Sequence, residues 1–411
     1  MTAARPTVAH LVTPYLFSTG SWIHSQLMYN RDFRPIVITQ RTENLDLFPF
    51  EPVYNLAARG PARLAAMAEK YLHGAYPPGP YRDILEREAV DLLHAHLGWE
   101  GARTVTLSRG PRRPFVVSFY GRDAGLLPRK LYWRILYKRL FKLADRVLAE
   151  GPHMGRVLAQ IGAPPEKIRV VHLGIPLEEF PFAERGAATA GEAAAPAAGE
   201  ANPAAAAVSE ALHADGGEGL GSGSVTALMA ASFREKKGIA YALEAVARLA
   251  PRHPGLRLRV IGDGPLRPQF EARISRPDLR GRVELLGYQP YPVYRRELAA
   301  AQIFLAPSVT AADGDTEGGA PVCLLEAQAS GLPIVATTHC DIPEVTRPGA
   351  SALLAPERDA ARLAELLEEL LLHPERWPAM GRAGRAHVEA EFNIRTQVER
   401  MNAVYRELLP A

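Results

Sequence analysis

The chain has 411 residues, of which 47% are hydrophobic and 23% are charged. This length is too great for one ordinary core and the composition excludes a wholly disordered chain, so we expect two globular domains. The sequence has no run of eighteen apolar residues and no secretory signal, and its two cysteines lack disulfide or zinc spacing. These features predict a soluble, cytoplasmic protein.

The charge is uneven along the chain. Residues 1–180 hold 24 Lys and Arg against 16 Asp and Glu, although the net charge of the whole chain is only +3. An excess of this size is too small to argue for nucleic acid. It indicates instead an anionic surface or acceptor near the N-terminal half.

Apolar strand-like runs alternate with helical stretches over the first 183 residues. The first run, residues 7–13, leads through a loop into a helix at Ser21. Gly20, just before that helix, either offers its backbone N–H to a phosphate or is ordinary turn chemistry. The alternation predicts a parallel, doubly wound α/β sheet. Further strands are expected at residues 35–39, 92–95, 114–119, 146–149 and 168–172, with helices at 61–73 and 98–108.

Polar residues stand at the ends of two of these strands. His94 and His96 alternate along one strand end, and because no third ligand is evident we favour structural or acceptor-lining roles over a metal site. Residues 118–123, SFYGRD, end the next strand, where open α/β sheets place ligands. Tyr120 is expected there either to contact a ligand or to pack against its neighbours.

Residues 129–143, RKLYWRILYKRLFKL, hold six basic residues and no acidic one, interleaved with apolar side chains at helical spacing. The pattern is typical of a basic amphipathic helix on an anionic membrane surface, with Trp133 and Tyr137 at the interface. It is equally typical of a domain helix whose charges are solvated. Both interpretations stay open at this point.

Residues 184–224 contain almost no large apolar side chain, so they cannot bury a core. We expect a flexible insertion there, between an N-terminal domain of residues 1–183 and a C-terminal domain of residues 225–391. Residues 392–411 are expected to form a final helix with one apolar face.

A second series of strands begins at Val225. The loop that follows the first of them, SFREKKG, places Arg234 and Lys237 before a helix, and a cationic loop at a helix start suits a diphosphate. The turn at residues 262–264, GDG, lacks the third glycine of a dinucleotide fingerprint, which argues against NAD. Another strand, residues 283–288, ends at Tyr288.

Residues 307–338 pack two carboxylates and several small residues into one strand-loop-helix-strand unit. Glu317 precedes a helix expected to begin at residues 320–322, and Glu326 lies just over one turn inside it. Gly318 and Gly319 let the backbone approach a ligand closely. The unpaired N–H groups at the helix start can hold a diphosphate, which leaves the carboxylates to accept hydrogen bonds from sugar hydroxyls.

These motifs together resemble those of retaining glycosyltransferases with the GT-B fold, specifically glycosyltransferase family four and its colanic-acid and exopolysaccharide type. The Glu317 to Glu326 segment is similar to the family's E-x7-E motif, with eight residues between the carboxylates. SFREKKG is similar to its G-R-x-x-x-K-K-G loop, with Lys237 in place and Ser232 where the Arg normally lies. SFYGRD is similar to His-Gly-x-Asp, with Tyr120 in the His position.

The resemblance implies two Rossmann-like domains that face a cleft, with the last helix crossing back to the first domain. It implies retaining transfer of a hexose from a nucleoside diphosphate sugar to a glycan or lipid-linked acceptor, with no metal and no further cofactor. If the basic helix at residues 129–143 contacts anionic lipid, the transfer takes place at the inner membrane face. Glu317, Lys237 and Arg234 are the implied catalytic residues, although Arg234 is equally consistent with a solvated charge. The implied donor-binding residues are Gly20, Tyr120, Ser232, Tyr288, Gly318, Gly319, Ala320, Pro321, Val322 and Glu326.

Two other functions are compatible with the sequence. The first is a GT-B accessory or binding protein without turnover, which the departures at Tyr120, Ser232 and the Glu spacing allow. The second is a related GT-B enzyme of the phosphorylase or epimerase type, which is disfavoured because no cofactor lysine or base signature is present. Release of nucleoside diphosphate from sugar nucleotides separates the three.

Overall fold

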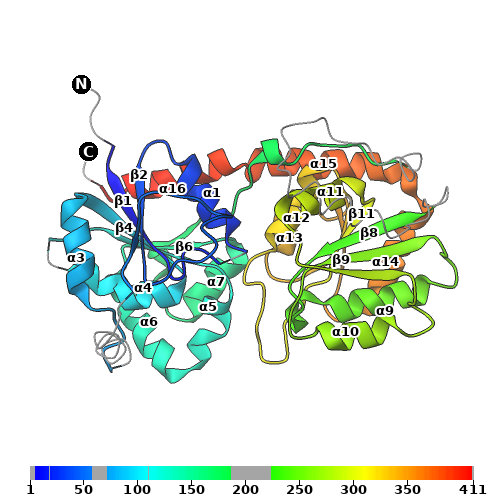
Figure 1. Ribbon diagram of the computed structural model, residues 1–411, viewed down its shortest axis with the longest axis horizontal. Coiled ribbons are helices and arrows are strands. Elements are labelled where there is room, and N and C mark those ends of the chain that lie inside the picture. The colour runs from blue at the N-terminus through cyan, green and yellow to red at the C-terminus, as the bar shows by residue number, and fades with distance from the viewer. Residues whose placement is uncertain (1–4, 18, 58–71, 110, 187–223, 410–411) are drawn as a thin grey trace.

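The computed structural model describes residues 5–17, 19–57, 72–109, 111–186 and 224–409. Two parallel sheets each form the centre of a domain, and the two domains lie side by side (Figure 1). The strand orders are β3-β2-β1-β4-β5-β6-β7 and β10-β9-β8-β11-β12-β13. The order reverses beside β1 in one sheet and beside β8 in the other, which is the doubly wound arrangement. The predicted α/β fold class is confirmed.

The N-terminal sheet follows the predicted strands closely, because strands covered on both faces read as continuous apolar runs. Strand β3 was not predicted, since it has three residues and none is fully buried. The helix expected at residues 61–73 lies almost entirely outside the described residues. The strands are β1 (Thr7–Leu11), β2 (Arg34–Thr39), β3 (Val53–Asn55), β4 (Val90–His96), β5 (Phe115–Phe119), β6 (Arg146–Ala149) and β7 (Ile168–Val170). The helices include α1 (Ser21–Tyr29), α3 (Pro78–Arg87), α4 (Gly98–Thr104), α5 (Arg122–Gly125), α6 (Leu131–Leu143) and α7 (Pro152–Gln160).

The C-terminal sheet is built in the same way, and helices α9 and α14 pack together on one of its faces. Its strands are β8 (Val225–Ala230), β9 (Leu256–Ile261), β10 (Val283–Gly287), β11 (Ile303–Ala306), β12 (Ile334–Thr337) and β13 (Ala352–Ala355). Its helices include α9 (Ile239–Leu249), α10 (Arg267–Ile274), α11 (Tyr291–Ala300), α12 (Val322–Ala329), α13 (Ile342–Val345), α14 (Ala360–Leu372) and α15 (Trp377–Glu391). Within the described ranges, no helix combines the length and the apolar character that a membrane span requires.

The last helix, α16 (Ile394–Arg406), leaves the C-terminal domain and lies against the N-terminal one, as the red ribbon in Figure 1 shows. Its Met401, Val404 and Tyr405 are buried in one cluster with residues of β1, β4 and β5. Asn402 on α16 also accepts a hydrogen bond from the side chain of Asn30, at 2.9 Å. The chain therefore crosses between the domains twice, once before β8 and once at α16.

Most of the expected insertion at residues 184–224 lies outside the described residues. Arg185 is described, and it is buried. Its guanidinium donates to the backbone carbonyls of Ala299, Leu298 and Ser330 in the C-terminal domain. The chain is thus held against that domain beyond the expected start of the insertion.

Candidate active site

The loop between β11 and α12 carries a buried ion pair. Glu317 accepts a hydrogen bond from Lys237 Nζ at 2.7 Å and another from Ser308 Oγ at 2.8 Å. Burial raises the pKa of the Glu317 carboxyl, but the charges of Lys237 and Lys236 and these hydrogen bonds outweigh burial and lower it. Burial lowers the pKa of Lys237, and the Glu317 charge more than reverses that effect. Both groups are therefore charged at neutral pH.

A hydrogen-bonded chain behind the ion pair fixes the backbone of Glu317. The Glu317 N–H donates to His339 Nε2 at 3.1 Å, so His339 carries its proton on Nδ1 and donates it to Glu357, at 2.6 Å. Glu357 also accepts from the backbone N–H of Thr310. Sequence reasoning missed His339 and Glu357, although a histidine directly after a buried strand was a usable signal.

Glu326 occupies a separate buried place on α12. Its two carboxylate oxygens accept hydrogen bonds from Tyr291 at 3.0 Å and from Tyr294 at 2.6 Å. Burial raises the pKa of Glu326 despite these hydrogen bonds. Both tyrosines lie on one face of α11, three residues apart, and sequence reasoning missed them as partners. Each carboxylate oxygen keeps a lone pair for a further donor.

Glycines let the loop at Glu317 touch the N-terminal domain. A Cβ atom on Gly318, whose φ is +86°, would lie 2.2 Å from the Cα of Gly121. A Cβ on Gly121, at the end of β5, would lie 2.4 Å from the carbonyl oxygen of Glu317. Gly318 therefore makes its close approach to the backbone of the other domain.

The start of α12 faces the same junction between the domains. The helix begins at Val322 with Pro321 as its N-cap, within the expected range. Ala320, Pro321 and Val322 line a pocket together with Glu150 and His172 of the N-terminal domain. The positive end of the helix dipole and its unpaired N–H groups therefore lie beside a space that both domains line.

Asp341, just after β12, binds a helix of the other domain. Its carboxylate accepts the backbone N–H groups of His153 at 2.7 Å and Met154 at 3.3 Å, at the start of α7. A Cβ on Gly151 would lie 2.3 Å from this carboxylate, so only glycine fits there. Asp341 therefore acts as the N-cap of α7 across the domain boundary.

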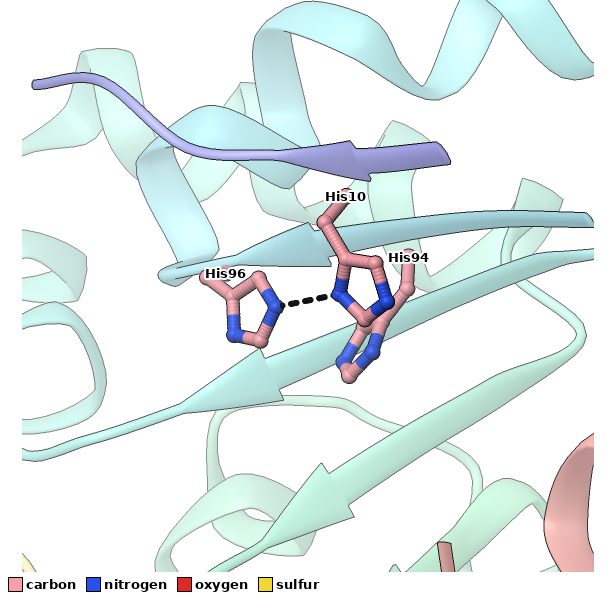
Figure 2. A group of neighbouring side chains, drawn as sticks. All are labelled: His10, His94 and His96. Atoms are coloured by element: carbon pink, nitrogen blue, oxygen red, sulfur yellow. Dashed lines mark hydrogen bonds between the residues drawn. The ribbon is translucent and has the colours of Figure 1, made fainter. Parts of the chain in front are cut away.

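Three buried histidines, His10, His94 and His96, lie close together in the N-terminal domain (Figure 2), and this network supports Tyr120. The Tyr120 hydroxyl lies 2.7 Å from His96 Nδ1, and His96 Nε2 lies 2.9 Å from His10 Nδ1. Our expectation that His94 and His96 lack a third potential ligand is wrong, because β1 pairs with β4 and places His10 beside them, with ligand atoms of all three within 4.8 Å.

Most of the imidazole nitrogens in this network already have partners. His94 is hydrogen-bonded to Tyr405 of α16 and to Ser118. Of the six imidazole nitrogens of these three described histidines, only His10 Nε2 is buried without a partner. Burial lowers the pKa of all three imidazoles, that of His10 to about 3, so they are neutral. This arrangement supports the structural role that we favoured, in which the network holds Tyr120 against the sheet.

Several predicted site residues lie away from the Lys237 and Glu317 pair. The Arg234 side chain is exposed and has no hydrogen-bond or ion-pair partner in the described part of the chain, and Ser232 contributes its carbonyl to the Arg234 N–H. Tyr288 is 64% exposed, and its hydroxyl donates to the Asp263 carbonyl. The Gly20 N–H donates to the Phe17 carbonyl at 2.8 Å, as in the ordinary turn that was the other interpretation of this glycine.

Helix α6 corrects a second expectation. Tyr137 is buried with its hydroxyl bonded to the Asp123 carbonyl, and Trp133 packs on the same core. Tyr137 is therefore not placed to reach a membrane, and Trp133 is only partly buried. The sequence could not identify the outer side, because apolar residues lie on more than one side of α6, and Leu131 and Ile135 are 69% and 61% exposed.

Comparisons with known proteins cover both domains. A family model described as "Glycosyltransferase Family 4" matches residues 25–179, and one described as "Glycosyl transferases group 1" matches residues 224–373. The chain is 33% identical over 310 residues to the amylovoran biosynthesis glycosyltransferase AmsK of Erwinia amylovora. It is 31% identical over 308 residues to the putative colanic acid biosynthesis glycosyltransferase WcaL of Escherichia coli. Each alignment covers 74% of this chain and 67% of the relative, so the chain spans about two thirds of their length.

The fold has solved counterparts. The structure of Anabaena HepE in complex with UDP has a TM-score of 0.73 at 15% identity, over 98% of this chain and all of that one. The sucrose-phosphate synthase of Thermosynechococcus elongatus has a TM-score of 0.71 at 17% identity, over 98% of this chain and 99% of that one. At these identities the likeness concerns the fold, and it confirms the predicted two-domain GT-B architecture.

Proposed function

Since the chain belongs to glycosyltransferase family four, the group 1 glycosyltransferases, we propose that it transfers a hexose from a nucleoside diphosphate sugar to a glycan or lipid-linked acceptor with retention. The observation that carries this proposal is the buried pair of Lys237 and Glu317 beside the start of α12. The names of the relatives, which concern amylovoran and colanic acid, support an acceptor in surface-polysaccharide synthesis.

The chemistry follows from what each group of the pair offers. Departure of the diphosphate concentrates negative charge, and the Lys237 ammonium with the N–H groups at the α12 start are fixed donors for it. When the diphosphate approaches, Lys237 shares its hydrogen bonds with the phosphate, and the Glu317 oxygens gain room to accept from hydroxyls of the transferred sugar. These cationic and dipolar groups stabilise the leaving group without a metal, so we propose metal-independent transfer.

Glu326 is assigned to the nucleotide ribose. Because Tyr291 and Tyr294 hold its carboxylate in one orientation, its remaining lone pairs are preorganised for two hydroxyl donors. Ser232, Tyr288 and Arg234 stay proposed donor contacts, because each lies on a loop of the same domain that a bound nucleotide can draw in. Tyr120 is the proposed contact from the N-terminal domain.

The outer side of α6 fits an acceptor carried on an anionic membrane. Leu131, Tyr132 and Ile135 are exposed there, on the same helix as the exposed Arg134, Lys138 and Lys142. Basic charges near an anionic surface contribute about 1 kcal/mol each at most, so binding should be reversible and salt-sensitive.

Vesicle co-sedimentation tests this part of the proposal. The wild type should pellet with anionic vesicles at low salt, and a variant with Arg134, Lys138 and Lys142 changed to Gln should not. The control changes three exposed arginines of the C-terminal domain, Arg276, Arg280 and Arg296, to Gln. If the wild type does not bind anionic vesicles, or if both triple variants bind them equally, the proposal of a membrane-borne acceptor fails and a soluble acceptor is the better proposal.

Release of nucleoside diphosphate from a panel of UDP-, GDP- and ADP-sugars, with a metal chelator present, tests the function itself. We expect one donor to be turned over, and the chelator to leave the rate unchanged. Binding without release would favour the accessory protein, and activity that disappears with the chelator would refute metal independence.

A further inference from the structure

Glu150 is a buried carboxyl at the junction of the two domains. It directly follows β6, at the carboxyl end of the N-terminal sheet, and its backbone carbonyl is bonded to His172 Nδ1 at 2.8 Å. A Cβ on Gly319 would lie 2.4 Å from Glu150 Cγ and 2.7 Å from Oε1. The Glu150 side chain therefore rests on the loop that leads into α12, which is the expected diphosphate site.

One oxygen of this carboxyl has no partner. Glu150 is 8% exposed, and its Oε1 is buried without a hydrogen bond among the described residues. Glu150 also lines two pockets, one beside Tyr120 and Ser118, and one beside Ala320 and Val322. Leaving a buried polar atom unpaired destabilises a protein, so an unpaired Oε1 in a space that both domains line points to a ligand atom as its partner.

The surroundings favour the protonated form of Glu150. Burial and the negative charges of Asp123, Asp341 and Glu317 raise the pKa of its carboxyl well above the ordinary value, and the Gly319 backbone N–H offsets only part of this. Its other titratable neighbours are Tyr120, in the same pocket, and His172. A carboxylate here would repel a diphosphate, whereas a carboxylic acid donates a hydrogen bond to it.

We propose that the carboxyl group of Glu150 is a diphosphate-binding group, which donates a hydrogen bond from the N-terminal domain to a phosphate oxygen of the bound sugar nucleotide. The inference rests on the proposed function for the identity of the ligand. It assigns the N-terminal domain a direct part in holding the donor, and it makes donor affinity depend on the proton of Glu150.

Calorimetric titration with UDP and GDP, from about pH 6 to about pH 9, tests the proposal in three variants. Glu150→Ala should weaken binding about tenfold at the acid end, the value of one lost hydrogen bond. Glu150→Gln keeps a donor of the same size, so its affinity should stay near that of the wild type at the acid end. Glu166→Ala, an exposed glutamate of the same domain, is the control and should bind like the wild type.

The pH dependence of nucleotide affinity distinguishes a hydrogen bond donated by the Glu150 proton from packing of the Glu150 side chain alone. Wild-type affinity should fall as Glu150 loses its proton, and Glu150→Gln should lack that fall, with the titration of the nucleotide itself common to both proteins. Equal affinity in Glu150→Ala and the wild type would overturn the proposal. So would the same pH profile in Glu150→Gln and the wild type, a comparison that holds even if Glu150→Ala does not fold. Because nucleotide binding is measured apart from turnover, a failure of the donor panel would count against the proposed function alone.

Discussion

Lys237 Nζ and Glu317 Oε2 lie 2.7 Å apart, and both side chains are largely removed from water, at 19% and 6% exposure. In such a place the interaction of one charge with another is much stronger than in bulk water. The ammonium is therefore held ready before any phosphate arrives, which is what a preorganised catalytic group requires. Lys236 is different, because it bonds Asp315 and the Thr316 carbonyl and so anchors the loop.

Changing Lys237 to Ala should reduce nucleoside diphosphate release about a hundredfold or more, as the removal of one preorganised donor does. Lys236→Ala is the matched comparison, and it should reduce the rate less, because it loosens the loop without removing the charge at the leaving group. Initial rates at saturating donor decide between them. Similar losses in both variants would show that the loop, and not the Lys237 charge, limits turnover.

Sequence motifs singled out Glu317 and Lys237 by their local spacing in a loop and at a helix start, and the structure pairs the two side chains. The motifs did not identify Glu150, Asp341 or His339. Their contacts with Gly319, His153 and Glu357 span 18 to 188 residues of the chain, and local spacing carries no information on such contacts. Arg234 shows the opposite limit of sequence reasoning. It lies in a cationic loop that resembles a family motif, yet its side chain is exposed.

At the scale of elements, β1 and β4 pair in register and bring His10 beside His94. Burial lowers the pKa of His10, His94 and His96 below the ordinary value of 6.5. The unfolded chain binds protons at these groups below about pH 6.5, and the folded chain does not. Their contribution to stability is therefore complete above that pH and is lost as the pH falls below it.

We predict that the three histidines lower the free energy of unfolding between about pH 7.5 and about pH 5.5, by up to about 1.4 kcal/mol each, whereas the raised pKa values of Glu150 and Asp123 act in the opposite direction. Urea unfolding at the two pH values measures the change. His10→Gln should have a smaller pH-dependent loss, whereas His373→Gln, an exposed histidine, should keep the wild-type loss. An equal pH-dependent change in His10→Gln and in the wild type would contradict the buried neutral network.

Most strands of both sheets were predictable, because each is a short apolar run bounded by turn residues, whereas β3 has no fully buried residue and was missed. Helix α6 was predictable as a helix, but its outer side was not. Its aromatic residues divide between the core, where Tyr137 lies, and the surface, where Tyr132 lies. Only the packing of α6 against its neighbours determines which side of the helix faces the core and which side faces solvent.

At the scale of the whole molecule, the loop at Glu317 is held against the N-terminal domain by two kinds of contact. One is the approach of backbones at Gly121 and Gly318, and the other is the cap that Asp341 supplies to α7. Helix α16 ties the domains together from another direction. The two domains are therefore held closed on each other, and residues from both domains are proposed to bind the sugar nucleotide.

Changing Asp341 to Ala should loosen this closed arrangement, because it removes the cap across the boundary. Asp359→Ala is the control, since Asp359 caps α14 within its own domain by accepting the Arg362 N–H at 2.8 Å. Each cap contributes about 1 kcal/mol. Small-angle scattering should show a larger radius of gyration for Asp341→Ala only. If neither variant shows an increase, the prediction that Asp341 holds the domains together is wrong.

Glu317 and Glu326 provide the most direct test of the central claim, because the account gives them different parts of one donor. Nucleotide affinity by calorimetry and donor turnover should be measured together in Glu317→Gln and Glu326→Gln. We predict that Glu317→Gln keeps its affinity for the bare nucleotide while its turnover falls about a hundredfold. Glu326→Gln should lose nucleotide affinity itself. Equal losses of affinity in both variants, or unchanged turnover in Glu317→Gln, would contradict the account.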